Sequence, residues 1–316
     1  MHHDQGKSDL QSRDPRRSLE IAVLETVLYS DLFEYALTRA EVAHYLIGVE
    51  SDIEKIRACL EQPHYLNGHL KQIDGHVVAR RREALVDLRR ARTAPSSRLW
   101  RRARRFTRVL AAMPFVRMVA VTGALAMDNS AEGDDIDILI VARRGRVWTA
   151  RLLGVMVVVA GKAFGDTLCP NYVISEDALA IETRDVFTAH EFAQMVPLHG
   201  LDVYERMRLA NAWVLSYLPN ARRPFRIERE IRSGPLGRAI RGIGEWVLGG
   251  RLGDALEEWE MRRKQRKFAP QVTPESNALL DRDHVKGHFN DYGLPVRRLF
   301  AERLAQFADV RGETVS

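Results

Sequence analysis

The first ninety residues alternate between helical and strand-like spacing. Apolar residues recur every three to four positions from Ser18 onward, which predicts a helix there. A shorter helix is expected from Thr38, with Glu41 three residues later as in a capping box, and a third from Ser51 or Asp52. The spacing then changes, and residues 69–72 and 76–80 resemble two short strands around Asp74-Gly75, a typical hairpin turn.

Three short helices followed by a hairpin is the order of a winged helix, a variant of the helix-turn-helix. A DNA-binding module of this kind uses its third helix in the major groove, and here residues 52–61 mix acidic and basic side chains. Residues 80–108 then hold twelve arginines and are interrupted at Ala94-Pro95, which predicts two connecting helices. These arginines form either a solvated surface or a contact for nucleic acid through the winged helix and residues 80–108.

Longer apolar runs follow. Residues 115–121, 134–142 and 168–175 have the length and composition of buried strands, the second with acids at its start. Residues 146–163 predict a long buried helix between the second and third. We therefore expect an α/β (α+β) fold with a small mixed sheet flanked by helices. The expected divisions are a tail at 1–17, a winged-helix-like module at 18–94, an α/β domain at 95–198 and a helical C-terminal region at 199–316.

Composition narrows the classes of protein that remain. Of the 316 residues, 46% are hydrophobic and 28% charged, which excludes a wholly disordered chain. Two cysteines, Cys59 and Cys169, cannot build a disulfide framework or a four-thiolate zinc site. The longest apolar run, residues 152–161, is half the length of a membrane span, and the first ten residues lack the apolar core of a signal peptide. We expect a cytoplasmic protein without a membrane span.

Asp135 and Asp137 stand at the start of the second apolar run. Residues two apart on a strand project from the same face, so the two carboxylates repel each other and are costly to bury unpaired. A divalent cation relieves both costs, and hard oxygen ligands suit Mg²⁺ or Mn²⁺. The preceding strand ends at Thr122-Gly123-Ala124, where a glycine turn lets the backbone approach a phosphate.

Gly123-Ala124, ten further residues and then Asp135-Ile136-Asp137 resemble the signature of the nucleotidyltransferase superfamily with the polymerase-β-like fold. The resemblance implies a sheet of nucleotidyltransferase type whose core covers about residues 98–190. It also implies that Gly123 and Ala124 cradle the triphosphate of an NTP and that Asp135 and Asp137 hold the metal. Asn129-Ser130, ahead of the aspartates, is similar to bacterial forms of this domain, and we add Thr122 and Ser130 to the nucleotide-binding candidates.

Two departures from the family pattern concern catalysis. The usual serine after the glycine is Ala124 here, so Thr122 or the backbone would replace its hydroxyl. The family also takes a third carboxylate from a later strand, where this chain offers Asn171 as the polar position. The acids near that strand are alternatives: Asp166, Glu176, Asp177 and Glu182.

Two other segments hold polar residues that could belong to the same site. A helix expected from 187 to 195 holds His190, interpreted as an ordinary helix residue, and Glu191. In the C-terminal helical region, Lys286 is a candidate for contact with the nucleotide.

The predicted reaction transfers a nucleoside monophosphate from an NTP to an unknown acceptor by Mg²⁺-dependent two-metal chemistry. In this hypothesis Asn171 or a nearby acid activates the acceptor hydroxyl. A first alternative is a catalytically degenerate regulator that binds nucleotide and DNA without turnover. A second is a partner protein of the toxin–antitoxin kind.

Overall fold

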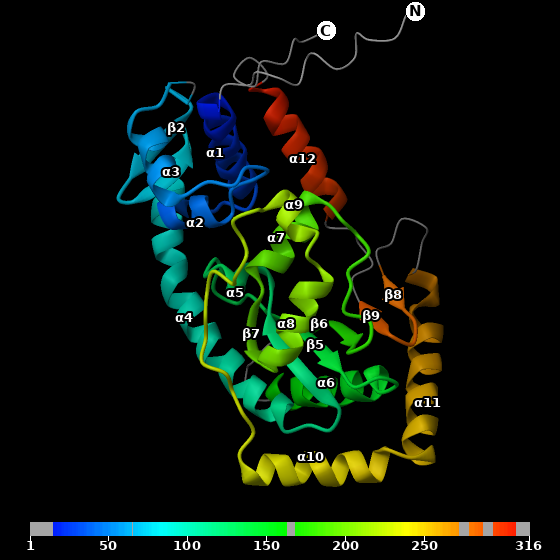
Figure 1. The fold of residues 1–316 in the computed structure, drawn as a ribbon. Coiled ribbons are helices and arrows are strands. Elements are labelled where there is room, and N and C mark those ends of the chain that lie inside the picture. Colours follow the sequence, from blue (N-terminus) through cyan, green and yellow to red (C-terminus); the bar gives the residue numbers. More distant parts are fainter. Residues whose placement is uncertain (1–14, 65, 163–167, 272–277, 287–292, 308–316) are drawn as a thin grey trace, which may run out of the picture. The chain divides into compact units, whose positions relative to one another are not determined.

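The computed structural model describes residues 15–64, 66–162, 168–271, 278–286 and 293–307. The chain forms two compact units (Figure 1). Unit 1 contains residues 1–89, 215–222 and 296–316, and unit 2 contains residues 90–214 and 223–295. The boundary at residue 89 lies inside helix α4 (Ala84–Ala111), so one continuous helix contributes to both units.

Unit 1 contains the three predicted helices and the predicted hairpin. Helices α1 (Pro15–Asp31), α2 (Arg39–His44) and α3 (Ile53–Glu61) accompany an antiparallel sheet of order β1-β3-β2. Its strands are β1 (Leu37–Thr38), β2 (Leu70–Ile73) and β3 (His76–Ala79). The capping box at Thr38 and Glu41 is confirmed, since each side chain accepts a hydrogen bond from the other's backbone N–H. Most of α12 (Gly293–Ala305) also belongs to this unit.

Unit 2 is built on a mixed six-stranded sheet of order β7-β4-β5-β6-β9-β8. Strands β5 and β6 are parallel, as expected for two strands joined by a helix, and the other pairs are antiparallel. The strands are β4 (Val116–Val121), β5 (Ile136–Ala142), β6 (Leu168–Ser175), β7 (Val196–His199), β8 (Leu279–Leu280) and β9 (His284–Lys286). The three strands predicted from apolar runs correspond to β4, β5 and β6.

Helices complete unit 2. The helix predicted over 146–163 is α6 (Val147–Lys162), which connects β5 to β6. It is buried only in part, since Met156 and Val159 are exposed. The remaining helical elements of this unit are α5 (Gly123–Ala126), α7 (Val186–Gln194), α8 (Leu201–Ala210), α10 (Pro235–Leu248), α11 (Arg251–Phe268) and the 3₁₀ turn η1 (Ala269–Gln271). Helix α9 (Val214–Tyr217) belongs to unit 1 except for its first residue. None of the described helices is both long and apolar enough to cross a membrane.

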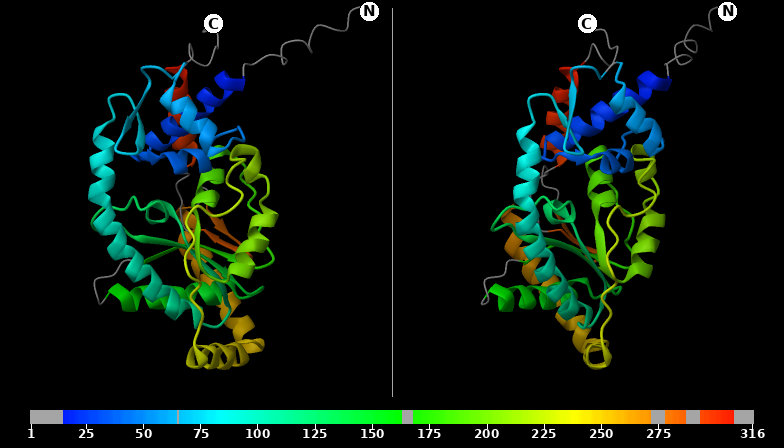
Figure 2. Two further views of the ribbon diagram at one scale, coloured as in Figure 1. Left: turned by 60° about the vertical axis from the view of Figure 1, so that its left-hand side comes forward. Right: turned by 90° about the vertical axis from the view of Figure 1, so that its left-hand side faces the viewer.

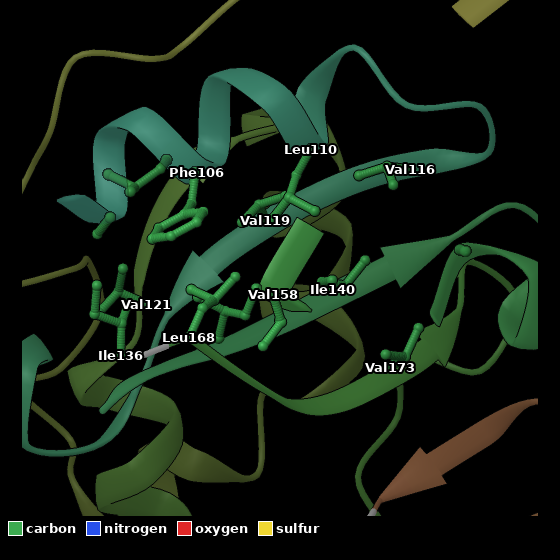
Figure 3. Packing of buried hydrophobic residues seen from close by; sticks show 14 of the residues in the cluster. Phe106, Leu110, Val116, Val119, Val121, Ile136, Ile140, Val158, Leu168 and Val173 are labelled. Carbon is green, nitrogen blue, oxygen red and sulfur yellow. The ribbon is translucent and has the colours of Figure 1, made fainter. Parts of the chain in front are cut away.

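One face of the sheet carries the main core (Figure 3). Phe106 and Leu110 of α4, together with Val158 of α6, pack with the alternate residues Ile136, Ile138 and Ile140 of β5. Because side chains alternate across a strand, the residue between the first two isoleucines, Asp137, projects from the opposite face.

Two segments differ from the prediction. Helix α4 runs unbroken through Pro95, where two helices were expected. Buried residues after the proline, such as Trp100 and Phe106, hold this helix on the sheet, and this packing offsets the roughly 3 kcal/mol cost of an internal proline. Residues 279–286, expected to be helical, form β8 and β9 instead, because Val285 inserts into the core between two partly exposed neighbours, a strand pattern.

Candidate active site

Gly123 lies directly against the carboxylate of Asp137. The backbone N–H of Thr122 donates to the Asp137 carbonyl over 3.0 Å, which continues the pairing of β4 with β5 past Val121. Gly123 has φ of +64°, and a Cβ at this position would stand 2.8 Å from Oδ2 of Asp137. Glycine is therefore required twice, by the left-handed backbone and by the closeness of the carboxylate.

The two aspartates predicted from the sequence lie at the beginning of β5. Asp135 is exposed and immediately precedes the strand, whereas Asp137 lies within it and is partly buried. Burial, followed by the negative charges of Asp135 and Asp134, raises the pKa of Asp137 to about 6. The charge of Asp135 is thus the second cause of this rise, after the burial of Asp137.

A third carboxylate comes from helix α7. The Asp185 side chain caps this helix by accepting from the backbone N–H of Thr188 over 2.7 Å. The helix packs against α5 and leads directly into β7, where Val196 pairs with Val121 at the end of β4. This connection brings Glu191 near Asp137: burial and the charge of Asp137 raise the pKa of Glu191 to about 7.

Lys286 contributes a positive charge to the same group of residues. It lies opposite Tyr172 in the pairing of β9 with β6, and its Nζ is 6.0 Å from the centre of the Tyr172 ring. Its charge opposes the rise in the pKa of Glu191. We call Asp135, Asp137 and Glu191 the acidic group. Lys286 lies within electrostatic range of Glu191, and it comes from a strand instead of the expected helix.

The nucleotide-binding candidates around the glycine turn have different environments. Ala124 is exposed, and Thr122 is partly exposed and caps α5 without a side-chain hydrogen bond. Ser130 is fully buried: its N–H donates to Oγ of Ser96, and its own hydroxyl has no hydrogen-bond partner among the described residues. The enclosed position of Ser130 does not favour contact with a bound nucleotide.

Of the candidates on and around β6, the structure describes the side chains of Glu176, Asp177 and Glu182. Asn171 occupies an irregularity in the strand, since Pro170 pairs with Ile138 and Tyr172 with Leu139, and its side chain lies outside the described part of the structure, as does Asp166. The acids after β6 have partners: Glu176 accepts from the backbone N–H of Arg144, and Asp177 pairs with the Arg144 side chain.

His190, interpreted from the sequence as an ordinary helix residue, is buried in α7. Its Nδ1 lies 2.8 Å from the Val186 carbonyl one turn earlier, and burial lowers its pKa to about 4. The imidazole is therefore neutral at physiological pH. Its neighbour Glu191 is an acid on an otherwise largely apolar helix, and this is the sequence signal that points to a role for it.

Among the described residues, no group of three or more His, Cys, Asp or Glu side chains has the geometry to hold a metal ion unaided. Mg²⁺ in proteins is commonly held by one or two carboxylates together with substrate phosphates. Comparisons with protein-family models, with curated proteins and with solved structures found no match. The interpretation of the site therefore rests on the residues described above.

Proposed function

We propose that this protein is a Mg²⁺-dependent nucleotidyltransferase whose active site is formed by Asp135, Asp137 and Glu191. The observation that carries the proposal is the contact of Asp137 with the Gly123 turn. Two electrostatic links support it: the charge of Asp135 raises the pKa of Asp137, and the charge of Asp137 raises that of Glu191. Carboxylates that repel one another and are partly buried are costly to keep together unless a cation or proton neutralises them. A functional site is the usual reason for such an arrangement.

The donor set suits Mg²⁺ or Mn²⁺. All three side chains offer oxygen ligands, which hard divalent cations prefer. We assign Asp135 and Asp137 to hold the metal, as the resemblance to nucleotidyltransferases implies. When bound, the metal would neutralise charge on the triphosphate of the NTP. The backbone at Gly123 would approach the same phosphates, and Lys286 would supply a fixed positive charge nearby.

The proposed reaction joins an acceptor hydroxyl oxygen to the α-phosphorus of the NTP. The bond from that phosphorus to the oxygen bridging to the β-phosphorus breaks, and pyrophosphate leaves with the bonding electron pair. The acceptor proton passes to Glu191, the side chain that takes the role first given to Asn171 or a nearby acid. A carboxylate with a pKa of about 7 is well matched to accept a proton at neutral pH.

The experiment measures pyrophosphate release and nucleotide binding separately. Purified protein with Mg²⁺ and each of the four NTPs, offered candidate acceptors including the protein itself, should release pyrophosphate. Asp135→Asn and Asp137→Asn should lose Mg²⁺-dependent NTP binding and turnover together. Glu191→Gln should keep NTP binding within a few-fold and lose turnover by at least a hundredfold, as expected for a general base.

Glu132→Gln is the matched control, because Glu132 lies in the same loop, is exposed and pairs with Arg98 outside the acidic group. It should retain both activities. If the wild-type protein binds NTP in the presence of Mg²⁺ but shows no turnover with any NTP and acceptor tested, the catalytically degenerate regulator is favoured instead. Equal turnover by the wild-type protein and Asp137→Asn would overturn the proposal.

A further inference from the structure

Helix α10 is amphipathic, and its polar side is the one that packs onto unit 2. Arg241 donates to the carbonyl of Ala111, and Oε1 of Glu245 accepts from the Phe115 N–H over 3.0 Å and from Arg117 over 2.7 Å. These contacts fix the rotation of the helix about its own axis. In an ordinary amphipathic surface helix the apolar side, and not the polar side, packs onto the protein.

Two glycines on the same side allow the close approach. A Cβ at Gly237 would stand 3.1 Å from Cβ of Ala112, and one at Gly244 would stand 2.9 Å from Cγ of Pro114. Both positions lie on the side that carries Arg241 and Glu245, so the helix is seated closely through its small and polar residues.

The opposite side of α10 is apolar and exposed. Its exposed fractions are 75% for Leu236, 51% for Ile240, 64% for Ile243, 85% for Trp246 and 47% for Val247. The spacing of these residues follows one helix face. Figures 1 and 2 show α10 at the rim of unit 2, with no other element of that unit on its outer side. An apolar stripe of this kind on a soluble protein marks a surface that something else covers.

Arginines flank this stripe. Between residues 232 and 252 the exposed charged residues are Arg232, Arg238 and Arg251. Arg232 pairs with Glu230, and exposed Asp254, just beyond the window, pairs with Arg146. The only acid of α10, Glu245, is turned toward Arg117. The surface therefore combines the apolar stripe, which includes one tryptophan, with flanking arginines.

We propose that α10 binds the surface of an anionic lipid bilayer, with its apolar stripe inserted among the headgroups and acyl chains. Interfacial helices combine such a stripe with basic residues, and tryptophan favours the membrane–water boundary. With 14 residues the helix is too short to span a bilayer, so it lies in the plane of the surface. A second copy of the chain is a poorer occupant, because it would bring the arginines of both copies together.

The test is cosedimentation of the full chain with vesicles of phosphatidylcholine alone or mixed with phosphatidylglycerol. Binding should require phosphatidylglycerol, weaken as salt is raised, and fall at least tenfold in Ile243→Glu and in Trp246→Glu. Leu209→Glu is the matched control, because Leu209 is an isolated apolar residue on α8 with 78% exposure. It should bind as the wild type does.

Thermal unfolding of each variant establishes that the substituted chains remain folded. Absence of binding at every lipid composition would overturn the proposal. So would an equal loss of binding in Leu209→Glu. Concentration-dependent dimerisation that Ile243→Glu abolishes, with no vesicle binding by the wild type, would assign the stripe to a second copy of the chain instead.

Discussion

Gly123 links the backbone of the turn to the chemistry of the acidic group. Its positive φ favours glycine, and its missing side chain leaves room for the Asp137 carboxylate. The need for a positive φ and the need for space beside a carboxylate can be separated experimentally, because another glycine has only the positive φ. Gly145 also has a positive φ, of +68°, but a Cβ there would meet nothing within 4 Å.

We predict that Gly123→Ala lowers activity strongly, while Gly145→Ala leaves it unchanged. Both substitutions place alanine in the left-handed region, at a cost of about 1 kcal/mol in the free energy of unfolding. Only the first displaces Asp137. Urea unfolding and pyrophosphate release measured on both variants check this, and equal activities in the two would contradict the assigned role of Gly123.

Glu191 marks the limit of what sequence could predict at the residue scale. Asp135 and Asp137 could be found because two residues on one strand share a face at a fixed spacing. Glu191 is more than fifty residues away, and it joins them because β7 pairs with β4 and carries the end of α7 to the glycine turn. Such a long-range strand pairing leaves no local pattern in the sequence.

At the scale of elements, helix α2 is anchored by a buried acid. Glu41 accepts hydrogen bonds from the Thr38 N–H over 2.7 Å, the Tyr35 hydroxyl over 2.6 Å and the Arg89 guanidinium over 2.7 Å. Burial alone would raise the pKa of Glu41, but the hydrogen bonds and charge of Arg89 outweigh it, and the net direction is down. The capping box visible in the sequence is thus part of a larger network.

We predict that Glu41→Gln destabilises unit 1 by about 2–4 kcal/mol, because the substitution leaves Arg89 without its buried counter-charge. Circular dichroism during urea unfolding measures the loss. Glu83→Gln is the control: Glu83 is a more exposed acid that pairs with Lys71 over 3.2 Å, and its substitution should leave the unfolding midpoint unchanged. A wild-type midpoint for Glu41→Gln would contradict the prediction.

Elements with strong periodicity were predictable, and the exceptions have physical causes. The apolar runs correspond to β4, β5 and β6 because burial on both faces leaves a continuous hydrophobic signal. Helix α6 has the same apolar composition, although Met156 and Val159 on it are exposed. Strands β8 and β9 have two and three residues, too few for an alternation of apolar and polar positions to stand out. Helix α4 continues through Pro95 because its tertiary packing outweighs the tendency of proline to break a helix. In the third helix of unit 1, Lys55 pairs with Asp52 and Arg57 pairs with Glu54, in keeping with the mixed charge of residues 52–61.

At the scale of the whole molecule, all five tryptophans belong to unit 2. They are Trp100, Trp148, Trp213, Trp246 and Trp259. Trp100 and Trp148 are buried in its core. Intrinsic fluorescence therefore reports the unfolding of unit 2, which contains the acidic group, while circular dichroism reports both units. This separation allows the pH dependence of the candidate site to be followed in the intact chain.

The raised pKa values of Asp137 and Glu191 make a prediction with a definite sign. Protonation is favoured in the folded state, so each ionised carboxylate reduces stability, and the loss grows as the pH rises from about 4 toward 7. Buried His190 acts in the opposite direction over part of this range, since its pKa is lowered to about 4. The difference between wild type and Asp137→Asn isolates the carboxylate from this opposing contribution.

We expect Asp137→Asn to match the wild type near pH 4 and to be more stable by about 2–3 kcal/mol at pH 8, followed by tryptophan fluorescence in urea. Mg²⁺ should stabilise the wild type more at pH 8 than at pH 5, because a metal binds the deprotonated carboxylates, and should have no such effect on the variant. If the stability difference stays constant from pH 4 to pH 8, the pKa of Asp137 is not raised in the folded protein and the prediction fails. If Mg²⁺ stabilises both proteins equally, the cation binds elsewhere on the chain and the assignment of Asp137 as its ligand fails.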